Sequence, residues 1–99
     1  AYLIDYANYL EINGIGLHDD EIYIIADALY RLGEYDTALI KLRLLSEYYP
    51  IDEKYFLEAL CNKKIGHLSN MNNLLQKIIT KYPNSDYMKL AKLQFNILK

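Results

Sequence analysis

Few residues in this 99-residue chain have the types and spacing that chemistry requires. A metal site needs clustered His, Cys or carboxylate ligands, but His18 and His67 lie far apart, in separate predicted turns. The acidic run at 19–21 follows His18, and it is better explained as the negatively charged start of a helix. Cys61 falls among apolar residues of a predicted helix with no evident base to activate it, so a small buried core residue is the expected role. We therefore expect no catalytic residue, no metal and no cofactor.

The stretch Asn13-Gly14-Ile15-Gly16 is the nearest approach to a phosphate-binding loop. Such loops follow a strand and carry a Lys-Ser/Thr pair, and both features are missing from this stretch. It is most simply a linker between helices. The chain is therefore not expected to be an enzyme.

Composition excludes several other classes of protein. The formal charge is −2, with acids and bases mixed along the chain, so there is no basic patch for nucleic acid and no polybasic membrane arm. No apolar run approaches the roughly 20 residues of a membrane span, and no signal-peptide pattern opens the chain. Because the first residue is Ala1 rather than Met, we expect a processed chain or a fragment, and a removed signal peptide or lipid anchor stays an open alternative. A single cysteine allows no internal disulfide and leaves the compartment undecided.

Apolar residues recur at helical spacing, which predicts an all-α protein. Both prolines and all four glycines fall between the predicted helices. The spacing predicts helices over 1–12, 20–32, 37–48, 53–64 and 70–81, and a last one from 86 onward. The expected N-cap residues, which are short polar side chains that accept a backbone N–H, are Asp19 or Asp20, Asp36, Ser69 and Ser85.

The stretch Ile22–Pro50 contains several features at a characteristic spacing. Gly33 suits the left-handed residue that ends a helix, and Pro50 closes the stretch. The small residues Ala26 and Ala38 would let two antiparallel helices approach closely. Together these residues resemble one complete tetratricopeptide repeat. The resemblance implies a right-handed α-solenoid of about five antiparallel helices.

The rest of the chain repeats this pattern. A shift of 33 residues lays Gly33 on Gly66 and Pro50 on Pro83. We therefore expect a single domain over 1–99, which is a fragment of a longer solenoid. It divides into the end of a preceding repeat with its linker at 1–17, a repeat at 18–50, a degenerate repeat at 51–83 and the first helix of a further repeat at 84–99.

The second repeat can be aligned in two ways. Superposing the two turn glycines puts Glu58 and Asn62 at core positions, whereas a one-residue deletion in the turn puts Phe56, Ala59 and Leu60 there. Burying an unpaired carboxylate is costly. We therefore favour the deletion.

The segment from Tyr82 to Ala91, with Tyr-Pro followed by Ser85 and Tyr87, is similar to a signature of bacterial envelope tetratricopeptide proteins. Those proteins include the outer-membrane assembly lipoprotein of the BamD type and the Tol-Pal-associated coordinator. This resemblance covers only about ten residues. It implies a bacterial periplasm or cell-envelope setting rather than the cytoplasm.

The family resemblance also implies a binding surface, since certain positions of the first helix line the concave face of the solenoid. Acids and aromatic rings at those positions suit a protein or peptide partner with basic and apolar side chains, not a terminal carboxylate. Eleven tyrosines exceed what one groove can use, so packing or simple exposure remains an alternative role for the two tyrosines of this set. The concave-face residues are Asp20, Tyr23, Asp27, Tyr30 and Arg31.

The leading hypothesis is thus a non-catalytic protein-interaction scaffold. The alternative is a structural spacer or self-association segment, in which the terminal helices stack on neighbours. The half-repeats expected at both ends motivate the alternative.

Overall fold

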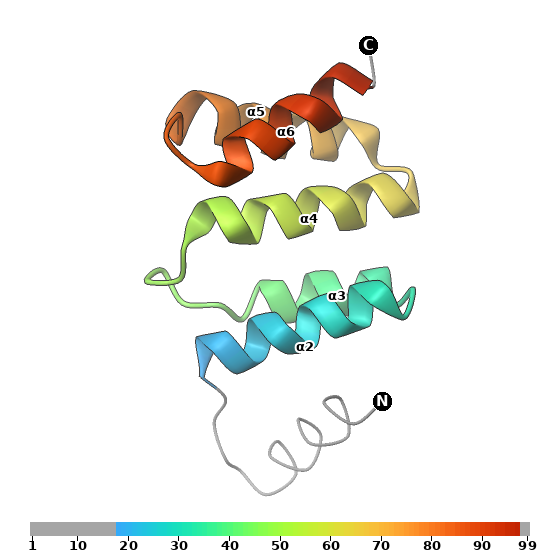
Figure 1. Ribbon diagram of the computed structural model, residues 1–99. Helices are drawn as coiled ribbons and strands as arrows, with labels where there is room; N and C mark the ends of the chain where they lie inside the picture. The colour runs from blue at the N-terminus through green and yellow to red at the C-terminus, as the bar shows by residue number, and fades with distance from the viewer. Residues whose placement is uncertain (1–17, 98–99) are drawn as a thin grey trace, which may run out of the picture. The chain divides into compact units, whose positions relative to one another are not determined.

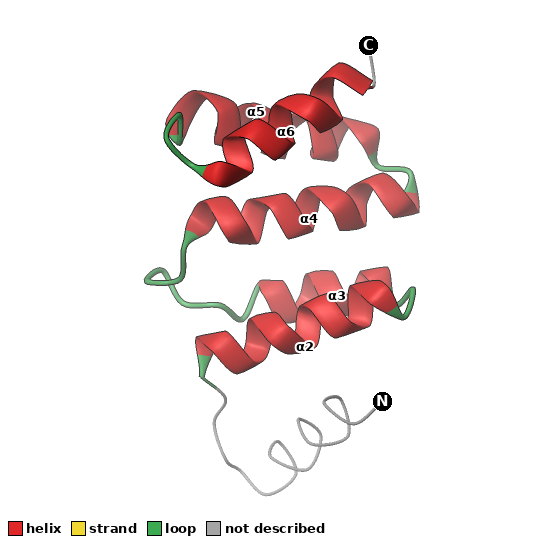
Figure 2. Ribbon diagram, viewed as in Figure 1, coloured by secondary structure: helices red, strands yellow, loops and turns green. Residues whose placement is uncertain are grey.

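The computed structural model describes residues 18–97, and every element of secondary structure in that range is a helix (Figures 1 and 2). In chain order these are α2 (Asp19–Arg31), α3 (Tyr35–Leu42), α4 (Ile51–Ile65), α5 (Leu68–Lys81) and α6 (Asp86–Ile97). The predicted all-α class is confirmed. The helix expected over 1–12 lies outside the described residues. None of the described helices has the length and apolar character needed to cross a membrane.

The chain forms two compact units divided between Tyr49 and Pro50, here called the N-terminal and C-terminal units. In the N-terminal unit α2 and α3 form a helical hairpin. Its buried residues recur every three or four positions, which puts them on one side of each helix. Ala26 and Ala38 are fully buried, as expected for small side chains that let the two helices approach. The other buried residues of this unit are Ile22, Ile25, Leu29, Leu42, Leu45 and Tyr49.

Left-handed glycines end the first helix of both hairpins. Gly33 has φ +85° and Gly66 has φ +87°, a conformation that strains any residue with a Cβ. In each turn the amide after the glycine donates to a carbonyl in the last helical turn, and the N···O distance is 2.9 Å both times. This pair of Schellman motifs confirms that the two turns are equivalent across the 33-residue shift.

The second helix of the N-terminal unit is shorter than predicted. The periodicity predicts helix over 37–48, but α3 covers only Tyr35–Leu42. Asp36 therefore lies within the first turn of α3 rather than at its N-cap, which is Glu34. After Leu42 the chain continues in tight turns to Pro50.

A hydrogen-bonded contact between Asp19 and Ser46 holds the chain just after α3 has ended. The Ser46 N–H donates to Asp19 Oδ1 at 3.0 Å, and the Ser46 hydroxyl donates to Asp19 Oδ2. The α-helical ladder ends before this contact, because the N–H groups of Leu44 and Leu45 already donate to carbonyls three residues back. Neither Asp19 nor Asp20 is the N-cap of α2, contrary to expectation. His18 holds that position, and its N–H donates to Glu21 Oε1 at 3.3 Å.

The C-terminal unit contains the same kind of contact, and we call both the Asp–Ser clasps. The Ser85 hydroxyl donates to Asp52, which lies 33 residues after Asp19. In both clasps the serine Oγ also accepts the N–H two residues further on, at 3.3 Å from Tyr48 and 3.0 Å from Tyr87. Each clasp ties the first turn of one helix to the segment that follows its partner helix.

In the C-terminal unit α6 packs against both α5 and α4 (Figure 1). Lys63 Nζ donates to Gln94 Oε1 at 2.9 Å and links α4 to α6. The expected N-cap at Ser85 is confirmed by its bond to the Tyr87 N–H. Ser69 is not an N-cap, because α5 already begins at Leu68 after His67. The buried core cluster consists of Ala59, Met71, Leu75, Ile78 and Ala91.

The preferred one-residue deletion in the second repeat is wrong. Asn62, a core residue only in the register set by the glycines, is buried. Phe56 and Leu60, core residues only with the deletion, are partly buried. Ala59 is fully buried and lies 33 residues after the buried Ala26, as the glycine register also requires. The register set by the two turn glycines therefore holds. Burying the Asn62 side chain costs little free energy, because it is neutral and its Nδ2 donates to the Glu58 carbonyl at 2.8 Å. Glu58 keeps its carboxylate partly exposed, 3.9 Å from a lysine ammonium.

The clasp in the N-terminal unit gives a pH-dependent prediction. Hydrogen bonds from the Ser46 hydroxyl and then the Ser46 N–H lower the pKa of Asp19 below its ordinary 3.8. A depressed pKa contributes stability above about pH 4, which is lost as the pH falls through the folded-state value. Asp19→Ala should lower Tm near neutral pH, and Ser46→Ala should lower it less because the N–H bond survives.

Thermal unfolding followed by circular dichroism at about pH 7 and pH 2 tests this expectation. The difference in Tm between wild type and Asp19→Ala should be smaller at the lower pH. Asp20→Ala removes an acid from the same helical turn without touching Ser46 and is the matched control. If Asp19→Ala and Asp20→Ala lowered Tm equally, the acids would act only through the helix dipole and not through Ser46.

Cys61 is fully buried, as expected, and burial followed by the nearby Glu58 charge raises its pKa from 9.0 to about 11. The folded thiol should therefore resist a thiol reagent at neutral pH and react only as fast as the unit unfolds. A raised pKa also means that stability falls as pH rises above about 9, where only the unfolded thiol ionises. The free energies of unfolding of wild type and Cys61→Ala, measured by urea titration across this range, should converge as the pH increases. Rapid labelling of Cys61 in the native protein would contradict its burial.

Candidate protein-interaction face

The five residues expected on the concave face all lie on α2, and we call them the α2 binding face. Their spacing places them along one side of the helix. Asp20 and Arg31 are exposed, while Tyr23, Asp27 and Tyr30 are partly buried. This side is distinct from the one that carries the buried core residues. The structure thus places the predicted residues together along one side of α2, with two of them exposed and three partly buried.

The two tyrosines of this face are held by other aromatic rings. Tyr23 stacks on Tyr49, with ring centroids 5.3 Å apart and planes at 23°. Tyr30 meets Tyr35 at 5.6 Å and 58°. Both contacts join α2 to the second half of the hairpin, so the tyrosines pack inside the unit and still present part of their rings. The packing role left open by the sequence is therefore real for both.

The charged residues of the face are more accessible than the rings. Arg31 Nε lies 3.0 Å from Asp27 Oδ2, and their side chains are 77% and 35% exposed. A solvent-exposed pair at this helical spacing contributes only about 0.3–0.5 kcal/mol, so a partner could replace it at little cost. Asp20 adds a second exposed carboxylate. The face therefore has one more acid than base.

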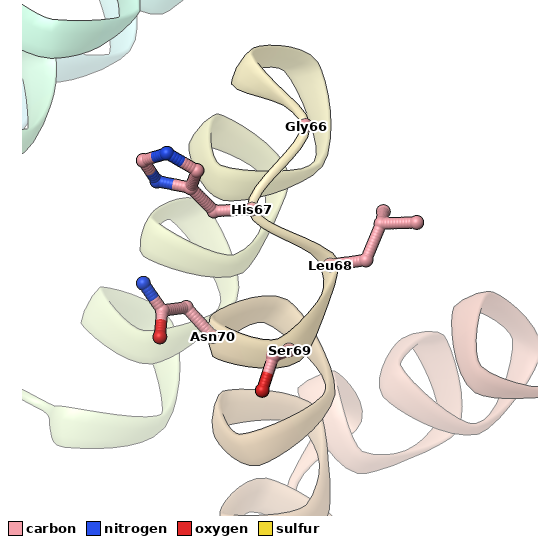
Figure 3. A pocket seen from close by; sticks show the side chains of 5 residues that line it. All are labelled: Gly66, His67, Leu68, Ser69 and Asn70. Atoms are coloured by element: carbon pink, nitrogen blue, oxygen red, sulfur yellow. The ribbon is translucent and has the colours of Figure 1, made fainter.

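Sequence reasoning missed two surface features. Tyr48 is 88% exposed beyond the end of α3, although the periodicity had placed it in a helix. A shallow hollow of about 470 Å³ lies at the turn from α4 to α5, lined by residues 66–70. There His67 and Asn70 project to one side and Leu68 to the other (Figure 3). Among the described residues, no three His, Cys, Asp or Glu side chains come together as metal ligands could.

Comparison with protein families agrees with the repeats seen in the fold. A family model described as tetratricopeptide repeat matches residues 22–50 and 55–85, which is more than half of the chain. The chain belongs to the tetratricopeptide repeat family. No curated protein sequence and no solved structure gives a significant match. The matches begin 33 residues apart, which supports the register set by the two turn glycines. Tetratricopeptide repeats generally mediate protein–protein interactions, and their families are typically non-catalytic.

Residues 82–91 have structural roles in the C-terminal unit. Ser85 caps α6 and donates to Asp52. The Tyr87 ring packs on Phe56 at 5.6 Å, and Ala91 is fully buried in the core cluster. These contacts show that Ser85, Tyr87 and Ala91 take part in the folding of the repeat. They do not identify a partner.

Replacement of Tyr23 tests its packing role. An aromatic pair adds about 0.5–1.5 kcal/mol beyond the area it buries. Tyr23→Ala should therefore destabilise the protein by at least that amount, while Tyr23→Phe retains the ring on Tyr49 and should cost much less. Urea denaturation monitored by circular dichroism gives both values. An unchanged free energy of unfolding in Tyr23→Ala would mean that the stack contributes nothing to stability.

Proposed function

We propose that this protein is a non-catalytic scaffold that binds a protein or peptide partner along the α2 binding face. The observation that carries the proposal is the grouping of Asp20, Asp27 and Arg31 with two tyrosines on one accessible side of α2, where each tyrosine ring is held against another tyrosine ring. Family membership supports a protein partner.

The chemistry of the face indicates the class of partner. Held tyrosine rings offer contact area with little conformational entropy left to lose. The exposed carboxylates attract cationic side chains and raise the rate of encounter. A segment with alternating basic and apolar side chains would fit both. We propose bacterial envelope assembly as the setting on the resemblance of residues 82–91 alone.

A second candidate function is that of a structural spacer that self-associates through end helices. It is favoured by two leucines on α6, Leu90 and Leu93, which are 43% and 60% exposed. Large apolar side chains at adjacent positions of one helix face are typical of contact surfaces.

Neutralising the acids tests the first candidate without removing the packed rings. The double variant Asp20→Asn, Asp27→Asn should bind Lys- and Leu-containing peptides from an array more weakly, by roughly tenfold for two charges. The remaining binding should depend less on salt concentration. Asp36→Asn, an exposed acid on α3, is the control and should bind like wild type.

Fluorescence anisotropy with the best array peptide provides the measurement. Equal affinity of wild type and the double variant would rule out the α2 binding face as the site. Binding of acidic peptides in preference to basic ones would contradict the proposed partner chemistry.

A further inference from the structure

The segment that follows α3 is fixed to α2 at two points. The Ser46 N–H and hydroxyl donate to Asp19 in the first turn of α2. Three residues later the buried Tyr49 stacks its ring on Tyr23, with the ring centroids 5.3 Å apart. Because Asp19 and Tyr23 are neighbours on the surface of one helix, residues 46–49 run alongside the first part of α2.

Tyr48 lies between these two fixed points and leaves its ring in solvent. The Tyr48 N–H donates to Ser46 Oγ at 3.3 Å, and the residue is 88% exposed, the most among the large apolar residues that the structure describes as exposed. The ring therefore adds little packing to the unit, although its backbone is held. A ring on a held backbone gives a partner contact area at little cost in conformational entropy.

Tyr48 is adjacent to the α2 binding face. Consecutive Cα atoms are about 3.8 Å apart, so the Cα of Tyr48 lies that close to the Cα of Tyr49, whose ring contacts Tyr23. An extended peptide advances about 3.3 Å per residue. A peptide that lies along α2 and contacts Tyr23 therefore reaches Tyr48 within about three further residues.

The charges around Tyr48 favour a cation. Asp20 on the α2 binding face and Glu47 in the same segment are exposed carboxylates. The described part of the N-terminal unit, residues 18–49, contains seven acidic residues against three basic ones. An aromatic ring attracts a cation over its face, and nearby carboxylates add to this attraction. The planar guanidinium of arginine stacks on such a ring, whereas the lysine ammonium is a compact and strongly hydrated charge.

We infer that Tyr48 binds an arginine side chain of the partner. The guanidinium lies on the exposed Tyr48 ring, and the Asp20 and Glu47 carboxylates supply the neighbouring negative charge. The inference rests on the proposed function, because the partner must lie along α2 to reach this ring. It adds a preference for one basic residue to the general attraction that the acids provide.

Two peptides that differ only in their basic residue test this preference, one of alternating Arg and Leu and one of alternating Lys and Leu. In fluorescence anisotropy, wild type should bind the Arg peptide more tightly by roughly two- to fivefold, the range of a cation–π contact at an exposed site. Tyr48→Ala should abolish this preference, whereas Tyr48→Phe retains the ring and should keep it. The exposure of Tyr48 means that circular dichroism should show unchanged folding. Leu44→Ala is the matched control, since Leu44 also follows α3 and is 57% exposed, and it should keep the preference.

The variant Tyr48→Trp tests the contact directly, because the chain contains no tryptophan of its own. It should keep the preference for the Arg peptide, since tryptophan is the best ring for a cation–π contact. Its fluorescence should change when the Arg peptide is added. Leu44→Trp should show no such change.

The outcomes separate this inference from the proposed function. If Asp20→Asn, Asp27→Asn weakens binding of both peptides while Tyr48→Ala keeps the Arg preference, only the inference is overturned. Unchanged fluorescence of Tyr48→Trp with the Arg peptide bound would also overturn it. If the double variant binds both peptides like wild type, or wild type binds neither peptide, the α2 binding face is not the site and both are overturned.

Discussion

The Asp–Ser clasp is the constraint on which the form of each repeat depends. A helical hairpin fixes its turn locally through a left-handed glycine, but the segment after its second helix is held by a residue far away in sequence. In the N-terminal unit, the Asp19 carboxylate accepts the Ser46 N–H and hydroxyl just after α3 and holds the chain there. The same carboxylate lies at the positive end of the α2 dipole, where a negative charge is favourable. One side chain therefore stabilises the start of α2 and the end of its hairpin. In the C-terminal unit the serine directly precedes α6, so the clasp there also sets where the next helix begins.

Those features of the fold that depend on local rules could be predicted from the sequence. Gly33 and Gly66 marked the turns because few other residues tolerate φ near +85°, and apolar spacing located five helices. The end of α3 could not be predicted, because Leu45 keeps the helical period and is buried even though the helix has ended. The bonds that hold the chain after α3 come from Asp19, which is remote in sequence. Asn62 illustrates the same limit, since its burial is tolerated through one side-chain bond to a backbone carbonyl.

The candidate site was predictable as a set of positions but not as a set of contacts. Helical spacing is enough to put Asp20, Asp27 and Arg31 on one side of α2. The stacking of Tyr23 on Tyr49 depends on how the chain returns after α3, and hence on the clasp. Because that ring packs inside the unit, the partner selectivity proposed for this face should depend chiefly on the acids, whose replacement leaves the packing intact.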